Sequence, residues 1–166
     1  MDDFIQRQGP AYLAHILRRL ADELVRGAAE WYPEAGVSAP PRTTSTLLAL
    51  EEHGPLGLTE LAVLLRQSHP LVIDWRRQLL ELGLVESQSD PEDGRRAILS
   101  LTPAGRREVR RLRRALVVME KTSRRLMELG GSGLFEALWR MDAALERESF
   151  AERLRDQDIE ASKRSG

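Results

Sequence analysis

Hydrophobic side chains recur every three or four residues in several stretches of the chain, which is the spacing of one face of an α-helix. The first stretch follows Gly9-Pro10 and is expected to form a helix that runs to about Trp31. Its apolar stripe consists of Leu13, Ile16, Leu17, Leu20 and Leu24. Residues 33–41 are rich in proline and glycine and therefore predict a linker.

Two short helices are predicted after the linker. The second helix should be capped by one of the hydroxyl residues at 43–45 and should stop at Gly54, which is followed by Pro55. The third helix is expected to be capped near Thr59 and to continue through Leu65.

A fourth helix is predicted to begin at a cap formed by Ser68 or His69 and to end at Gly83, with Pro70 in its first turn. Its expected buried face is Val72, Trp75, Leu79 and Leu82. The third and fourth helices are joined by so short a turn that they form a candidate helix-turn-helix.

The period then changes to that of short strands. Residues 84–88 and 97–101 are strand-length runs, and residues 90–96 between them are rich in turn formers and end in two arginines. The pattern predicts a two-stranded hairpin with a basic tip. An isolated hairpin is marginally stable in water, so it must pack against the preceding helices.

A long helix is expected to be capped and opened at Thr102-Pro103, and a last helix should follow the glycine-rich break at 130–133. The expected face of the last helix is Leu134, Leu138, Met141 and Leu145, with the rings of Phe135 and Trp139 beside it. The stripe of the long helix is Val109, Leu112, Leu116, Met119 and Leu126. The fold class expected is mainly α with a small β-hairpin, a winged helix-turn-helix with N- and C-terminal dimerisation helices. The expected organisation is an N-terminal dimerisation helix and linker over 1–41, a DNA-binding lobe over 42–102, C-terminal dimerisation helices over 103–155 and a flexible tail over 156–166.

Composition narrows the function. The sequence has no cysteine, which excludes disulfides, thiolate metal sites and thiol-based redox sensing. Its three histidines lie in separate elements without metal-ligand spacing, and no phosphate loop or nucleophile elbow is present, so we expect no metal, no cofactor and no enzyme activity. No apolar run is long enough to span a membrane and the N-terminus lacks a secretory signal, which favours a cytoplasmic protein without a membrane partner.

The formal net charge of −1 hides an asymmetry along the chain. Residues 66–125 contain 14 basic and 8 acidic side chains, whereas the segments on either side are acidic. A basic middle favours contact with a polyanion, while mixed solvated charges on long helices are the alternative.

Three stretches carry a resemblance to a known family. They are Leu58-Thr59-Glu60-Leu61-Ala62, then Leu82-Gly83-Leu84-Val85, and then the run DPEDGRR at 90–96 with Leu101-Thr102-Pro103-Ala104-Gly105-Arg106 after it. Over about residues 10–150 the sequence resembles the MarR family of bacterial transcription factors. The resemblance implies a homodimer whose two winged lobes bind a pseudo-palindromic operator in double-stranded DNA. It also implies repression that, in many members, a small aromatic or phenolic effector relieves.

The leading end and outward face of the fourth helix are the expected readers of DNA, because a helix fits the major groove. The candidates are Ser68, His69, Pro70, Ile73, Asp74, Arg76 and Arg77. Arg77 can bond guanine in a bidentate fork or clamp a phosphate, and His69 can either read a base or only cap the helix. Asp74 departs from the family, because a carboxylate is repelled by phosphates; it can accept from cytosine or pair with Arg77 or Gln78.

In the wing, Asp93 and Arg95 match the family's acid and arginine, and Arg96 follows them. We expect this group either to fix the loop shape or to place an arginine in the minor groove. Gly94 stands where relatives often carry another arginine.

The remaining expectations concern partners. An effector cleft of the family type would lie between the first, second and fifth helices, with His15, Trp31, Tyr32 and Met119 as its expected lining, although core or dimer packing also explains each residue. The alternative to a DNA-binding regulator is a dimeric protein-interaction module that kept the winged-helix fold and lost DNA binding, as Asp74 and Gly94 suggest.

Overall fold

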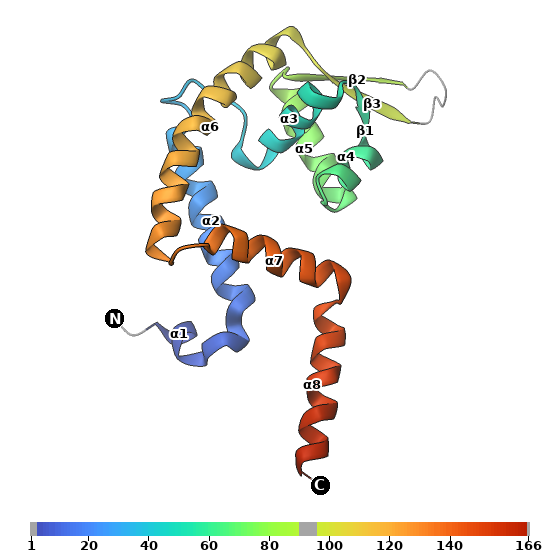
Figure 1. Ribbon diagram of the computed structural model, residues 1–166. Coiled ribbons are helices and arrows are strands. Elements are labelled where there is room, and N and C mark those ends of the chain that lie inside the picture. Colours follow the sequence, from blue (N-terminus) through green and yellow to red (C-terminus); the bar gives the residue numbers. More distant parts are fainter. Residues whose placement is uncertain (1–2, 90–95, 166) are drawn as a thin grey trace. The chain divides into compact units, whose positions relative to one another are not determined.

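The computed structural model describes residues 3–89 and 96–165, and these are mainly helical, as predicted (Figure 1). The helices are α1 (Phe4–Gln8), α2 (Leu13–Trp31), α3 (Thr44–His53), α4 (Leu58–Leu64), α5 (His69–Glu81), α6 (Pro103–Leu129), α7 (Leu134–Arg147) and α8 (Phe150–Ser165). Two 3-10 turns, η1 (Gly9–Tyr12) and η2 (Pro41–Thr43), precede α2 and α3. The strands are β1 (Leu56–Gly57), β2 (Val85–Ser89) and β3 (Ala97–Leu101).

The chain divides into two compact units, residues 1–117 and residues 118–166. The first unit contains a winged helix-turn-helix lobe built from α3, α4, α5 and the three strands. It also contains α1, α2 and the first half of α6. The second unit contains the end of α6 together with α7 and α8.

The sheet of the lobe is antiparallel, with the order β1-β3-β2. Val85 pairs with Leu101 and Ser87 with Leu99 in the hairpin, while Leu56 pairs with Leu99 on the opposite edge. The predicted hairpin is confirmed in β2 and β3, and β1, which was not predicted, adds a third strand to the sheet. A strand of two residues is too short to show the alternation by which strands are recognised in a sequence.

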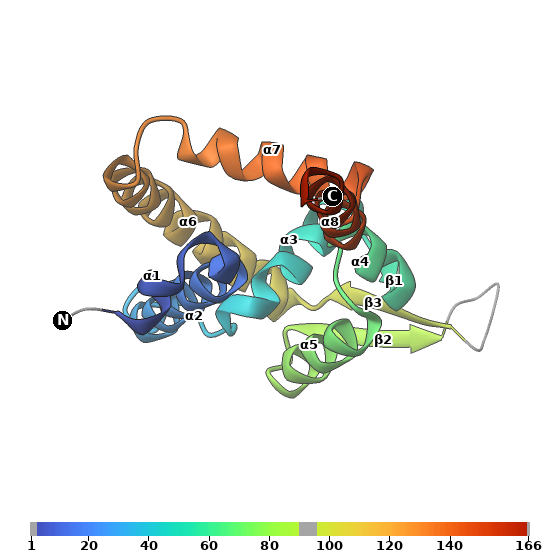
Figure 2. The same ribbon diagram turned by 90° about the horizontal axis from the view of Figure 1, so that it is seen from below.

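Leucines from four elements of the lobe and from α6 form a common hydrophobic core. Leu47, Leu61, Leu79, Leu99 and Leu112 are each at most 1% exposed. α5 packs against β2, while α3 and α4 pack against β3 (Figure 2). Burial of such side chains is worth about 1.5–3 kcal/mol each, so these contacts hold the helix-turn-helix on the sheet.

Two helix starts differ from the sequence prediction. α4 begins at Leu58 rather than after a Thr59 cap, and the Glu60 carboxylate accepts a hydrogen bond from the backbone N–H of Gly57 at 2.7 Å. α5 has Ser68 at its N-cap position, as one alternative predicted, but the Ser68 side chain makes no capping bond. The start of α5 therefore depends on Pro70 and on tertiary packing more than on a capping side chain.

The chain ends also differ from expectation. The short helix α1 precedes α2, with the Asp3 carboxylate accepting from the backbone N–H of Ile5 at 2.8 Å. The tail predicted to be flexible over 156–166 is helical in α8 as far as Ser165. Within residues 3–89 and 96–165, no helix combines the length and hydrophobicity needed to cross a bilayer.

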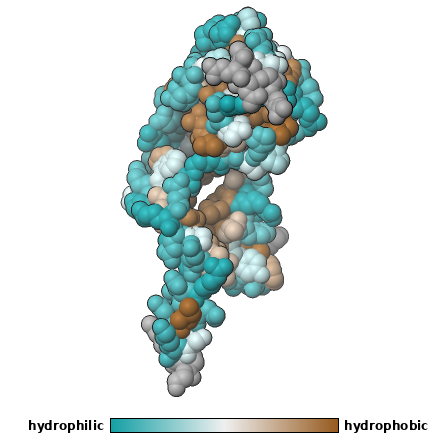
Figure 3. All heavy atoms as spheres, turned by 90° about the vertical axis from the view of Figure 1, so that its right-hand side faces the viewer, coloured by the Kyte–Doolittle hydropathy of each residue, from teal (hydrophilic) through white to brown (hydrophobic). Residues whose placement is uncertain are grey.

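Hydrophobic side chains remain at the surface of both units. On the lobe face shown in Figure 3 a hydrophobic patch is bordered by hydrophilic residues. In α2, the predicted stripe is largely exposed, and in α7 the same holds for the predicted face and the neighbouring rings, in which Phe135 meets Trp139 edge to face. Faces of this kind mark interaction surfaces.

Candidate nucleic-acid interface

α5 has one buried face and one exposed face, as the helical spacing predicted. Val72, Trp75 and Leu79 are buried, whereas Ile73 and Arg77 are exposed. Leu82 is an exception, because it was expected in the buried face and is 44% exposed. Leu82 is the C-cap of α5, where the chain turns into Gly83, so its side chain no longer follows the helical face.

The leading end of α5 is open. Ser68, His69 and Pro70 are all exposed, and His69 and Pro70 occupy the first turn of the helix. The first turn of a helix presents unsatisfied backbone N–H groups and a positive dipole end, both of which favour an approaching phosphate. His69 is thus placed where a base-edge or phosphate contact is sterically open.

Asp74 pairs on the surface of α5 with the two residues that the sequence offered as partners. Its Oδ1 accepts from Arg77 Nη2 at 2.5 Å, and its Oδ2 accepts from Gln78 Nε2 at 2.7 Å. The hydrogen bond from Arg77, followed by that from Gln78, lowers the pKa of Asp74 below its usual value. Asp74 is therefore ionised at neutral pH and bound to its own helix.

Arg76 lies at the junction of α5 and the wing. Its Nη2 donates to the Ser87 hydroxyl on β2 at 3.2 Å, and the side chain is half-buried. Arg76 thus links α5 to the hairpin, a contact that the sequence did not predict when it placed Arg76 among the candidates for DNA binding.

The described part of the wing is fixed to α4 through Arg96. Arg96 Nη2 lies 3.4 Å from Glu60 Oε1. The Arg96 side chain also lies close to Gly57, because a Cβ added at Gly57 would be 3.3 Å from the same nitrogen. The expected wing residues Asp93 and Arg95, like Gly94, fall outside the described residues. Of the predicted wing group, Arg96 alone is placed, at the base of the hairpin and exposed.

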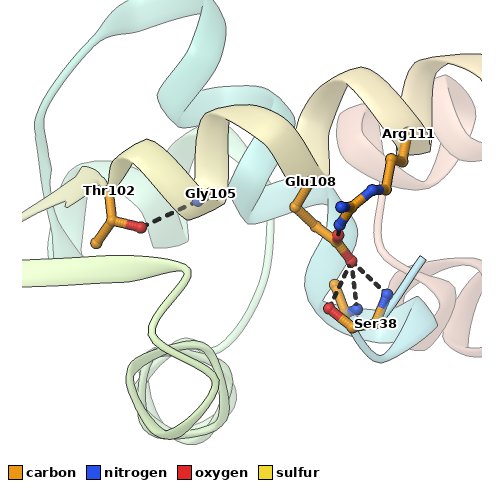
Figure 4. A network of polar contacts seen from close by, with 6 residues as sticks. Ser38, Thr102, Gly105, Glu108 and Arg111 are labelled. Atoms are coloured by element: carbon orange, nitrogen blue, oxygen red, sulfur yellow. Dashed lines mark hydrogen bonds and ion pairs between the residues drawn. The ribbon is translucent and has the colours of Figure 1, made fainter. Parts of the chain in front are cut away.

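Hydrogen bonds join the start of α6 to the turn that follows α5, and Figure 4 shows the bond between Thr102 and Gly105 at the N-terminus of α6. The Thr102 hydroxyl accepts from the Gly105 N–H at 3.0 Å, which confirms the predicted cap, and donates to the Gly83 carbonyl at 2.7 Å. The Thr102 N–H donates to the Leu84 carbonyl at 3.1 Å. A Cβ on Gly105 would lie 1.9 Å from that carbonyl oxygen, so only glycine fits here.

A buried carboxylate anchors the linker after α2 to α6. Glu108 is fully buried and accepts hydrogen bonds from the backbone N–H of Ser38, the Ser38 hydroxyl at 2.9 Å and the Ala39 N–H at 2.8 Å (Figure 4). Arg111 Nη1 donates to its second oxygen at 3.1 Å. Burial raises the pKa of Glu108, but these donors outweigh burial and hold the pKa below its usual value.

Sequence reasoning missed the role of Glu108, although a signal existed. Glu108 stands three residues after Gly105 and four before Leu112, on the buried stripe of α6 among exposed arginines. An acidic residue at a stripe position is expected to have partners, because an unpaired buried charge is costly.

The arginine run at the start of α6 is partly engaged within the protein. Arg106 donates to the Leu101 carbonyl at 2.8 Å, Arg111 bonds Glu108, and Arg113 donates to Glu51 at 2.6 Å. These bonds favour the interpretation of the run as a solvated face that also braces the lobe.

Of the residues expected to line an effector cleft, Trp31 and Tyr32 are neighbours, whereas His15 lies far from them along α2. Tyr32 lines a pocket of about 460 Å³ with Ser38 and Ala39 of the linker. The centroid of the Trp31 ring lies 6.4 Å from the centroid of the Tyr32 ring. Burial raises the pKa of Tyr32 above its usual value, although a hydrogen bond with Thr44 acts in the opposite direction. His15 lies about 25 Å away along α2, given 1.5 Å per residue. Met119 belongs to the second compact unit.

Metal chemistry has no candidate site in the part of the chain that the structure describes. Across residues 3–89 and 96–165, no three histidine or carboxylate side chains gather as ligands for an ion.

Comparisons with known proteins agree with this architecture. Residues 41–97 match the model of the MarR family, a segment that includes the helix-turn-helix and most of the wing. No curated protein matches the chain. A solved structure described as a probable transcriptional regulator from Pseudomonas aeruginosa is 26% identical, with a TM-score of 0.61, over 80% of this chain and 96% of that one.

Two further structures are similar in fold. The PcaV transcriptional regulator from Streptomyces coelicolor, in complex with its natural ligand, is 23% identical over 92% of this chain and all of that one, with a TM-score of 0.64. A mutant MarR from E. coli, complexed with operator DNA, is 15% identical over 87% of this chain and 99% of that one, with a TM-score of 0.67. The similarity in fold thus extends well beyond the matched segment.

Proposed function

We propose that this chain is a winged-helix transcriptional regulator of the MarR family, whose model residues 41–97 match, and that it acts as a homodimeric repressor of a pseudo-palindromic DNA operator. The observation that carries the proposal is the exposed leading face of α5. His69, Pro70, Ile73 and Arg77 are exposed on one side of a helix whose other side is buried in the lobe. A helix held in this way can enter a major groove without unfolding any part of the core.

The proposed division of labour follows from the chemistry of each side chain. Arg77 reads guanine, Ile73 contacts a thymine methyl group, and His69 donates to a base or phosphate. Arg76 and Arg96 flank this face and supply contacts to the DNA backbone, and Arg95, which the sequence assigns to the wing, supplies a contact to the minor groove. The phosphate contacts give salt-dependent affinity, whereas the contacts of α5 give sequence choice.

Exposed leucines support the homodimer. Leu13, Leu17, Leu20 and Leu24 form a stripe on α2 that is between 39% and 55% exposed in the single chain. Covering such a stripe with the same stripe of a second copy removes apolar surface from water on both sides, and two-fold symmetry then presents two α5 helices to one duplex.

A small effector completes the proposal. The PcaV structure contains that protein's natural ligand, and the pocket beside Tyr32 is large enough for a small aromatic compound. It adjoins the linker that Glu108 holds to α6, so an occupant could act on the support of the lobe. Because the proposed partner is chromosomal DNA, the proposal also places the protein in the cytoplasm.

The test is selection of bound fragments from random duplex DNA by the full-length chain. A two-fold motif with half-sites about one helical turn apart is the expected result, and the selected duplex should be released by raising the salt concentration. A panel of small aromatic and phenolic compounds, added to the complex, then tests the effector. Selection that enriches no sequence would contradict a specific regulator.

A second candidate is a dimeric interaction module that has lost DNA binding. The observation in its favour is the ion pair between Asp74 and Arg77, which cancels a positive charge on the face that would meet DNA. Affinity for duplex DNA that is independent of salt, or too weak to measure at low salt, would support this candidate over the first.

A further inference from the structure

Asp74 is an acidic residue on the exposed side of a helix that is proposed to enter DNA, where a negative charge is repelled by phosphates. Its side chain is 42% exposed, and that of Arg77 is 68% exposed. Both carboxylate oxygens are in use, because Oδ1 accepts from Arg77 and Oδ2 from Gln78. The carboxylate is therefore held from two sides on its own helix, in an orientation set by i,i+3 and i,i+4 neighbours.

The bond to Asp74 leaves Arg77 able to bind a base. A guanidinium carries five N–H donors, and the bond to Oδ1 uses one of them on Nη2. A bidentate fork to O6 and N7 of guanine needs two donors on one edge of the guanidinium. Arg77 can therefore satisfy Asp74 and a guanine together, one on each edge.

The pair also changes the electrostatics of α5. An arginine attracts phosphates at every DNA sequence, which raises affinity without discrimination. Asp74 is ionised at neutral pH, since its bonds to Arg77 and Gln78 lower its pKa. The pair together carries no net charge, so its attraction for phosphate is weaker while its hydrogen-bonding edge persists.

We propose that Asp74 is a positioning residue for base readout, which orients Arg77 toward guanine and reduces its attraction for phosphates at other sequences. The inference rests on the proposed function. It predicts that discrimination and non-specific affinity move in opposite directions when the carboxylate is removed. A residue that merely stabilised α5 would change neither quantity in this way.

The experiment uses the full chain and the operator obtained by selection. Binding is measured at several salt concentrations to the selected duplex, to duplexes with single G·C pairs replaced, and to a random-sequence duplex. For Asp74→Asn we expect affinity for the random duplex to rise about 5-fold at low salt, the effect of removing one charge about 4 Å from another in water. Discrimination at one G·C pair in each half-site should fall about 5-fold or more, the lower end for a bidentate contact.

A second variant separates orientation from charge. Gln78→Ala removes the donor to Asp74 Oδ2 without changing the charge of the helix. We expect it to lower discrimination at the same G·C pair, by less than Asp74→Asn does, and to leave the affinity for the random duplex within about 2-fold.

Glu81→Gln is the matched control. Glu81 is an exposed acidic residue near the end of the same helix that acts on Arg77 through charge, with no hydrogen bond between the two among the described contacts. Its removal should raise affinity for the random duplex and leave the base preference unchanged. Thermal unfolding of every variant confirms that the fold is retained.

The outcomes separate the inference from the proposed function. If wild type and Asp74→Asn discriminate equally between the selected duplex and duplexes with a replaced G·C pair, the inference is wrong, while the proposed function as a DNA-binding regulator is unaffected. If Asp74→Asn changes base preference even in an Arg77→Ala background, Asp74 reads a base directly and the positioning role is wrong. If wild type binds no duplex DNA, the proposed function fails and the inference fails with it.

Discussion

Gly105→Ala is the most informative perturbation of the fold, because two effects of opposite sign compete at this residue. Alanine is a better helix former than glycine by about 1 kcal/mol, and at most helical positions the exchange stabilises a protein. At Gly105 the added Cβ would lie 1.9 Å from the Leu84 carbonyl oxygen and 3.2 Å from Leu101 Cδ2. Real Cβ contacts essentially never fall under 3.0 Å, so backbone must move by about 1 Å.

The movement disturbs a bonded junction. The Leu84 carbonyl accepts from the Thr102 N–H and lies within 3.2 Å of the Thr102 hydroxyl, which in turn caps α6. Overpacking costs about 1–3 kcal/mol, and lost hydrogen bonds add about 1 kcal/mol each. After the gain in helix propensity is subtracted, we expect Gly105→Ala to destabilise the protein by about 1–3 kcal/mol.

The measurement is chemical denaturation at fixed protein concentration, since a dimer would make stability concentration-dependent. Ala104→Gly is the matched control: it makes the reverse exchange one residue earlier in the same helix turn, and it should cost at most about 1 kcal/mol. The prediction is wrong if Gly105→Ala raises the free energy of unfolding by about as much as Ala104→Gly lowers it. Helix propensity alone would then govern the site, and the Cβ of residue 105 would not clash with the Leu84 carbonyl.

Four other outcomes follow from the structure. Arg77→Ala should weaken binding to the selected operator by about 5- to 150-fold, as measured by gel shift, and Arg77→Lys should not restore it, because lysine cannot form the fork. Arg95→Ala should weaken binding to the same operator through loss of a groove contact or of loop order; equal affinity for wild type and variant would remove the wing arginine from the interface. The pKa of Glu108 in the folded protein lies below its usual 4.5, so its charge stabilises the fold above that pH and the contribution is lost as the pH falls through the lowered pKa. Glu108→Gln should therefore lower the free energy of unfolding by about 1–3 kcal/mol at neutral pH, and the variant should lose less stability than wild type as the pH falls. Urea unfolding that shows the same loss of stability at acidic pH in both proteins would contradict this. Leu24→Glu should convert the dimer to monomer in sedimentation, since it places a charge in the exposed stripe of α2; an unchanged mass would show that the stripe is not the interface.

The candidate site was predictable where the signal was local. The spacing of Val72, Trp75 and Leu79 predicted the buried face of α5. The side chains around Arg77 lie on the opposite side of the helix, so the same spacing predicted that they are exposed. The pairing of Asp74 with Arg77 or Gln78 was also open to prediction, because residues three and four apart on a helix are neighbours. The choice among the alternatives for Asp74 needed the structure, since rotamers decide which neighbour is reached.

The effector residues show the limit of such reasoning. His15 and Tyr32 both belong to the region of α2, but a straight helix separates them by about 25 Å. Aromatic and histidine side chains suggest a ligand by type, whereas a pocket depends on which elements meet.

The sequence by itself determined the helices from α2 to α7, where the helix-turn-helix lies and which family the chain resembles, because these depend on periodicity, turn residues and motifs that are local in the chain. Tertiary structure alone decided that β1 joins the sheet, that Arg76 reaches Ser87, that Glu108 holds the linker, and that Gly105 meets Leu84. The physical reason is sequence separation. Each of these contacts joins residues at least 11 positions apart, and close packing of several elements at once, which no local pattern encodes, selects the partners.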